Sequence, residues 1–343
     1  MRSIAGGPVT SFDAETSMLH SLALLMTLGS AVPATSAGSC ATQQVGVRTG
    51  HSLAYDASMQ RVVMFGGESG DATDPLPTSL WAWDGTRWTC LASDGPPGRR
   101  DAFLGYDAAR RRLVLFGGRV MESGRRMRFL RDTWEWDGRQ WTQSDTAGPA
   151  PRIHGAMAYD VVRRALVIHG GGGADDILRD TWQWDGARWR EVPLRAPEGS
   201  IGDALIPTPR GVAFLILTPD NAPDCASGFR GSIFEPKGDT LVQIIGSRPG
   251  PCVSPIAPAT AAPEGFLLYT GWNKDEPALA WTWSAGAWHR WTSAPTRRRG
   301  PSMAYDEQRR RVVLFGGDDD TGLLGDTWEW DGRKWSDRRP MIR

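Results

Sequence analysis

Arginine recurs at a fixed place in this 343-residue chain, seven residues ahead of a tyrosine–aspartate pair. The four positions are Arg48, Arg99, Arg152 and Arg298. A guanidinium can bind a carboxylate or a sulfate through two parallel hydrogen bonds, so a ring of four would suit an acidic ligand. The alternative is that each arginine pairs with an acid or a carbonyl of its own repeat unit. The regular recurrence favours this alternative.

Other polar candidates lie in segments that follow glycine pairs and differ in length and charge. Together with the arginines, the predicted ligand-binding residues are Glu68, Asp71, Asp74, Arg125, Asp175, Trp272 and Asp319. Mixed charges beside an exposed tryptophan suit a polar ligand that stacks on the indole ring. The alternative is that these charges are ordinary solvated loop residues.

Sequence motifs for catalysis are weak. The stretch His169 to Gly172 resembles the oxyanion segment of lipases, but the chain has no Gly-x-Ser-x-Gly elbow. No Gly-Lys-Ser or Gly-Lys-Thr follows a glycine-rich stretch, which disfavours phosphate binding. We therefore predict no catalytic residue, no metal and no cofactor.

Tryptophan marks the element that positions these residues. Fifteen of the 17 tryptophans fall in five copies of a ten-residue pattern, best seen in Asp326 to Trp335. Two tryptophans two residues apart share one face of a strand. Four copies continue with Asp-Gly, which predicts a tight type I′ hairpin turn. The pattern therefore indicates a β-hairpin with a tryptophan stripe.

The hairpins belong to a longer repeat of about fifty residues, which ends its second strand at Gly-Gly. Each unit is predicted to hold four strands, here named a to d in chain order, with no convincing helical periodicity. Six such units arranged radially would bury both faces of every sheet. We therefore predict an all-β, six-bladed β-propeller over residues 40–343. Its predicted blades are 44–92, 93–145, 146–194, 195–246, 247–293 and 294–339.

The glycine pairs and the aromatic residues downstream resemble kelch repeats, and the predicted propeller is similar to the central domain of galactose oxidase. The pairs are Gly66-Gly67, Gly117-Gly118, Gly170-Gly171 and Gly316-Gly317. The resemblance implies that ligands bind at the end of the blades that carries the b–c loops and the d–a crossovers. The histidines and tyrosines needed for a copper radical site are missing. The acids Glu68, Asp71 and Asp74 depart by one residue in each gap from the iron-binding spacing of some kelch relatives.

Four cysteines suggest disulfides if the protein is exported. Cys225 is predicted in the b–c loop of the fourth blade and Cys252 in the crossover to the fifth, on the same face, so we predict that they pair. A Cys40–Cys90 bond then follows by elimination.

The first 39 residues suggest a signal peptide, because an apolar run at 19–28 precedes a segment rich in Ala, Ser, Thr and Pro. A disordered tail is the alternative. We expect a secreted or periplasmic monomer without a transmembrane segment. The formal net charge of zero gives no electrostatic reason to bind nucleic acid.

Together these features predict an exported propeller that binds a protein or a glycan through its b–c and d–a loops. The alternative is an enzyme, such as a metal-dependent lyase, that uses acids on the same face. An enzyme should have convergent acids or histidines with shifted pKa values in a deep polar pocket, whereas a binding module should have a broad rim.

Overall fold

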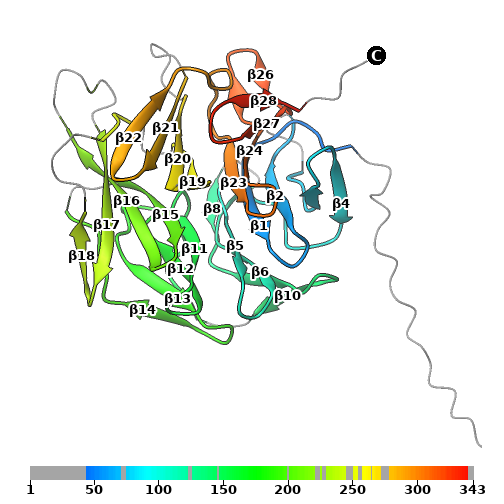
Figure 1. Ribbon diagram of the computed structural model, residues 1–343. Helices are drawn as coiled ribbons and strands as arrows, with labels where there is room; N and C mark the ends of the chain where they lie inside the picture. The colour runs from blue at the N-terminus through cyan, green and yellow to red at the C-terminus, as the bar shows by residue number, and fades with distance from the viewer. Residues whose placement is uncertain are drawn as a thin grey trace, which may run out of the picture. The chain divides into compact units, whose positions relative to one another are not determined.

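The computed structural model describes residues 44–338 except 71–74, 123–125, 145–146, 199–200, 221–224, 226–228, 245–249, 254–256, 264 and 272–277. The described residues contain strands and no helix, and they form six four-stranded antiparallel sheets. The predicted six-bladed β-propeller is therefore confirmed (Figure 1). The predicted leader, residues 1–39, lies outside the described residues.

Each sheet comes from one continuous part of the chain. The first three blades are β1 (Thr49–Asp56), β2 (Arg61–Glu68), β3 (Leu80–Trp83) and β4 (Trp88–Ala92); β5 (Phe103–Asp107), β6 (Arg112–Phe116), β9 (Thr133–Trp136) and β10 (Trp141–Ser144); and β11 (Ala156–Asp160), β12 (Ala165–His169), β13 (Thr181–Trp184) and β14 (Trp189–Val192). The last three are β15 (Ile201–Thr208), β16 (Gly211–Pro219), β17 (Phe229–Lys237) and β18 (Thr240–Gln243); β19 (Ala259–Ala262), β20 (Gly265–Thr270), β21 (Leu279–Ser284) and β22 (Ala287–Trp291); and β23 (Ser302–Asp306), β24 (Arg311–Phe315), β27 (Thr327–Trp330) and β28 (Trp335–Asp337).

The innermost strands close a ring. Each of β1, β5, β11, β15, β19 and β23 contacts the next, and β23 contacts β1. The first and last blades share no strand, and both backbone and side-chain hydrogen bonds join them. The Arg48 amide donates to the Leu324 carbonyl at 2.9 Å, and the Gly317 amide donates to the Arg48 carbonyl at 2.7 Å. The Leu53 amide in β1 donates to Ser302 Oγ in β23 at 3.1 Å, and the indole N–H of Trp88 donates to Thr327 Oγ1 at 3.0 Å.

The residues that recur in each repeat have structural roles at fixed positions of the blade. At Gly66, where φ is +74°, a Cβ would lie 2.4 Å from the carbonyl oxygen of Arg99, so the crossover into the next blade can pass only beside glycine. The strand-b residues Val62 to Met64 are fully buried between neighbouring sheets. Asp56 Oδ1 accepts the amides of Ser58 and Met59 at 2.8 and 3.1 Å, which confirms that the aspartate after tyrosine caps the a–b turn.

The prediction of a type I′ turn with Asp-Gly at its centre is wrong. Trp83 pairs with Trp88, the Asp84 amide donates to the Arg87 carbonyl, and Gly85 has φ of +99° whereas Asp84 is not in the left-handed region. The glycine is thus the first central residue of the turn. Asp84 precedes the two central residues of the turn, and its Oδ1 accepts hydrogen bonds from the amides of Thr86 and Arg87 at 2.8 and 2.9 Å.

Two ends of the blades can now be distinguished. We call the end with the b–c loops and the d–a crossovers the loop face, and the end with the a–b and c–d turns the turn face. Two loop-face hairpins extend the b–c loops of the second and sixth blades. They are β7 (Arg119–Met121) with β8 (Met127–Phe129), and β25 (Asp318–Asp319) with β26 (Gly322–Leu323).

Candidate functional site

The four recurring arginines are buried inside their own blades. The exposed fractions of Arg48, Arg99, Arg152 and Arg298 are 4%, 1%, 0% and 1%. In each case Nη1 donates to the first glycine carbonyl of the blade's own Gly-Gly pair, at 2.9 to 3.1 Å. Each of the four arginines is therefore bonded to a carbonyl of its own repeat unit, which was the alternative to a ring of arginines open to a ligand.

Three of these arginines also form a two-pronged ion pair. Arg99 holds Asp132 at 2.6 and 2.9 Å, Arg152 holds Asp180 at 2.8 and 2.9 Å, and Arg298 holds Asp326 at 2.6 and 2.9 Å. The arginine and the indole N–H two residues after each aspartate outweigh the effect of burial, so the pKa of each carboxyl is lowered. The guanidinium groups of these three arginines are therefore already paired with carboxylates of their own blades.

Arg48 differs from the other three because the first blade has Ser79 at the aspartate position. Arg48 Nη2 lies 3.5 Å from Ser79 Oγ, and its Nε has no hydrogen-bond partner among the described residues. Burial lowers the pKa of Arg48 to about 10. One of the four predicted arginines thus lacks the carboxylate that balances its equivalents.

Partly exposed ion pairs lie on the loop face of the first, second and sixth blades. The pairs are Arg100 with Glu68, Arg119 with Asp101, and Arg299 with Asp318. Together with His154 we call these residues the mouth cluster. Arginine side chains in it keep 22% to 49% of their surface exposed, so they can still contact a ligand.

Two residues of the mouth cluster have unusual backbone conformations. Asp101 and His154 have φ of +56° and +54°, at the position where the first and sixth blades have Gly50 and Gly300 with φ of +64° and +58°. The His154 Nδ1 to Asp101 Oδ1 distance is 3.8 Å, too long for a hydrogen bond. Burial is the main reason that the pKa of His154 is lowered.

Sequence reasoning missed Arg100, Asp101, Arg119 and His154 as members of one site. The signal that could have found two of them is their position two residues after a recurring arginine, where other blades have glycine. A non-glycine residue in the left-handed region is uncommon and often marks a functional position.

The remaining predicted binding residues do not form one group. Glu68 belongs to the mouth cluster, Asp175 is exposed in the b–c loop of the third blade, and Asp319 lies in the β25–β26 hairpin. The Thr321 hydroxyl and amide donate to Asp319 Oδ1 at 2.6 and 2.7 Å and lower the pKa of that carboxyl. Four further predicted residues lie outside the described residues: Asp71, Asp74, Arg125 and Trp272.

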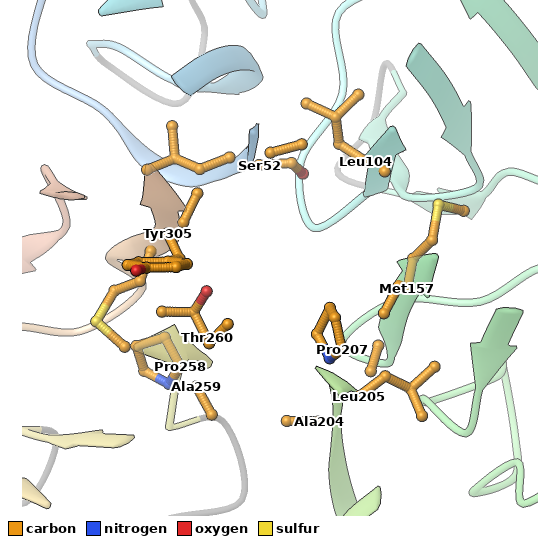
Figure 2. Close-up of a pocket in the computed structure, with 18 of the residues that line it drawn as sticks. Ser52, Leu104, Met157, Ala204, Leu205, Pro207, Pro258, Ala259, Thr260 and Tyr305 are labelled. Carbon is orange, nitrogen blue, oxygen red and sulfur yellow. The ribbon is translucent and has the colours of Figure 1, made fainter. Parts of the chain in front are cut away.

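The inner strands enclose a cavity of about 510 Å³ that extends between the two faces. Figure 2 shows side chains from all six inner strands around its open centre, among them Ser52, Leu104, Met157, Leu205, Thr260 and Tyr305. Most lining side chains are small or apolar. Among the described residues, the lining holds one carboxylate, that of Glu307, on the turn face.

The cavity does not bring acid–base groups together. Burial and the charge of Asp306 raise the pKa of Glu307, but this residue lies at the opposite end from the mouth cluster. Burial and the charge of Arg48 lower the pKa of His51 to about 3, so this cavity-lining histidine is neutral. The described part of the chain has no group of three His, Cys, Asp or Glu residues that could hold a metal ion.

The predicted Cys225–Cys252 disulfide is confirmed, with a Cα–Cα distance of 5.1 Å. Cys90 is not a free thiol, but its predicted partner Cys40 lies outside the described residues, so that pairing stays a prediction. Among the described residues there is no helix long and apolar enough to cross a membrane.

Comparisons with known proteins identify the fold but no family. No protein-family model matches the chain. A solved structure described as YjhT aligns with a TM-score of 0.61 at 12% identity, covering 86% of this chain and 99% of that one. Dynein regulatory complex subunit 7 of Chlamydomonas reinhardtii is 32% identical over 133 residues, or 36% of this chain. The match spans only 11% of that protein.

Proposed function

We propose that the protein is an exported kelch-type propeller that binds a charged protein or glycan through its loop face. The observation that carries the proposal is the mouth cluster, whose ion pairs involve three blades and leave arginine side chains 22% to 49% exposed. Binding sites concentrate on variable loops that a rigid scaffold positions. A surface of mixed charge selects partners through electrostatic complementarity.

The proposal that the blades are kelch-type is supported by the Gly-Gly pairs, whose positive φ angles let the next crossover approach. A relationship to galactose oxidase stays a prediction. The Cys225–Cys252 bond supports export, because disulfides persist in oxidising compartments. The similarity to a subunit of the dynein regulatory complex supports a protein ligand. A monomeric state also stays a prediction.

An enzymatic function is less well supported. Among the described Asp and Glu residues, the one with a raised pKa, Glu307, lies on the turn face, and the two histidines that line the cavity have lowered pKa values. General acid–base catalysis needs groups with suitable pKa values within reach of one substrate atom. No such pair is present among the described residues of the mouth cluster.

The test is a ligand screen on a glycan array and on a panel of purified extracellular proteins, with two matched variants. The loop variant combines Arg100→Ala, Arg119→Ala and Arg299→Ala. The turn variant removes three exposed arginines from the opposite face, through Arg111→Ala, Arg164→Ala and Arg310→Ala. We expect the loop variant to lose about tenfold or more in affinity, while the turn variant binds normally. The reverse pattern would place the binding surface on the turn face.

A further inference from the structure

The first blade departs from the arginine–aspartate pairing at a single position. Asp132, Asp180 and Asp326 stand two residues before the first tryptophan of their blades, and Ser79 stands there in the first blade. In the three other blades the aspartate accepts both an arginine and an indole N–H. Ser79 Oγ accepts a hydrogen bond from the indole N–H of Trp81 at 2.8 Å, whereas its distance to the Arg48 guanidinium is 3.5 Å.

The guanidinium of Arg48 is consequently left without a countercharge. Its exposed fraction is 4%, and its acceptors among the described residues are Gly66 O at 2.9 Å and Ser79 Oγ at 3.5 Å. The Nε atoms of its three equivalents donate to a backbone carbonyl at 3.0 to 3.1 Å, whereas Nε of Arg48 has no hydrogen-bond partner in the part of the chain that the structure describes. A buried charge without a partner is costly, so a bound anion would be favoured here.

The position of the missing carboxylate lies next to solvent in this fold. The side chains of Asp132, Asp180 and Asp326 keep 22%, 18% and 12% of their surface exposed. Ser79 itself is 9% exposed, and its side chain has two heavy atoms fewer than that of aspartate, so a carboxylate from outside can approach the place that the aspartate carboxyl group fills in the other three blades. It would meet the guanidinium in the two-pronged geometry that the other blades use internally.

We propose that Arg48 and Ser79 form a subsite on the loop face for the carboxylate group of the ligand, which displaces the long 3.5 Å contact between Arg48 Nη2 and Ser79 Oγ. The ligand carboxylate takes the place of the aspartate that the first blade lacks. This inference rests on the proposed function for its biological role, but the anion site can be tested without knowing the ligand. A carboxylate on the ligand could belong to an acidic sugar or to an acidic side chain of a protein.

The first experiment measures the melting temperature in sodium formate and in sodium chloride at equal ionic strength. For the natural sequence we expect formate to raise the melting temperature by about 2 °C or more at 100 mM. Ser79→Asp should melt higher in chloride and respond little to formate, because its own carboxylate fills the subsite. Asp180→Ser, the matched control, should melt lower and gain a formate response in the third blade.

An equal formate response in the natural sequence and in Ser79→Asp would overturn the proposal. It would also be overturned if only the double variant Asp71→Ala, Asp74→Ala responds, because a carboxylate of the chain itself would then fill the subsite. Neither result depends on the ligand screen, so failure of the subsite and failure of the loop-face function are distinguishable.

The second experiment separates the two sources of carboxylate by calorimetric titration. D-glucuronate is compared with D-glucose, and N-acetyl-glutamate amide with N-acetyl-glutamine amide. We expect one acid of the two pairs to bind at least about tenfold more tightly than formate and its neutral partner not to bind, with binding lost in Ser79→Asp. Equal binding of acid and neutral partner would contradict a carboxylate subsite.

Discussion

The indole N–H of Trp83 in the first blade donates to Glu329 Oε1 in the sixth at 2.8 Å. Glu329 also accepts Arg309 and Arg338, and its exposed fraction is 2%. The same relationship joins Trp184 of the third blade to Glu135 of the second at 2.7 Å. Since no strand is shared between the first and last blades, this side-chain contact is part of what closes the ring.

Replacing Glu329 with alanine should therefore weaken ring closure. The change removes the acceptor of Arg338 and of the Trp83 indole, and it removes one of the two carboxylates that pair with Arg309, the other being Asp306. We expect a loss of about 3 kcal/mol in the free energy of unfolding. Denaturant titration measures it. Glu191→Ala, which removes an exposed acid paired with Arg195, is the control and should cost less than about 0.5 kcal/mol. Equal effects of the two changes would show that Glu329 does not support closure.

The indole hydrogen bonds differ between blades, which allows a matched comparison. Trp184 and Trp136 are equivalent and buried, with exposed fractions of 0% and 3%. Trp184 donates to Glu135, whereas the Trp136 N–H has no partner among the described residues. Ala82 occupies, in the first blade, the position that Glu135 has in the second. Trp184→Phe should thus destabilise by about 1 kcal/mol more than Trp136→Phe, measured by denaturant titration. A larger loss for Trp136→Phe would contradict this assignment.

His169 should make the stability depend on pH. It is fully buried at a position that is Phe65, Phe116 and Phe315 in other blades, and burial lowers its pKa to about 3. Because the folded pKa lies below the unfolded value of about 6.5, stability is complete above pH 6.5 and declines as the pH falls toward 3.

Each such histidine contributes a slope of about 1.4 kcal/mol per pH unit within this window. His169→Phe should remove one such slope and leave the contributions of His51, whose pKa is also lowered to about 3, and of His154, whose pKa is lowered as well. Unfolding free energies of the natural sequence and of the variant at several pH values between 4 and 7 measure the difference. Unchanged pH dependence in His169→Phe would show that this histidine is not held neutral in the folded protein.

The Cys225–Cys252 bond should stabilise the two blades in which the tryptophan pattern is weakest. Its sequence separation is 27 residues. Closing a loop of this length contributes about 3 to 4 kcal/mol in the chain-entropy model. In denaturant titration, the free energy of unfolding of the double variant Cys225→Ser, Cys252→Ser should be lower by that amount. Because the variant lacks this disulfide, reductant cannot lower its stability by breaking that bond. A double variant as stable as the natural sequence would refute the estimate.

The fold could be predicted because every blade repeats its strand pattern. Gly-Gly pairs occur in four blades, where the next crossover passes close to the sheet, and Trp-x-Trp strands occur in five, so a single sequence contains several copies of the same signal. The Asp-Gly turn type was missed because the aspartate carboxylate, rather than the backbone preference of the pair, decides which residue occupies the centre.

The candidate site was only partly predictable. The own-blade pairing of Arg99, Arg152 and Arg298 was one of two readings, and only coordinates show which acid each guanidinium reaches. The mouth cluster joins residues of four blades, and the hydrogen bond between Trp83 and Glu329 joins residues 246 positions apart. The spacing of residues within one repeat does not show which residue of another repeat each of them contacts.

The most direct test of the loop-face proposal is amide hydrogen exchange with and without the ligand that the screen identifies. We predict slower exchange in the crossovers and b–c loops, around Arg100, Arg119 and Arg299, and unchanged exchange in the a–b turns near Arg111, Arg164 and Arg310. Slower exchange confined to those turns would contradict the proposal and assign ligand binding to the turn face.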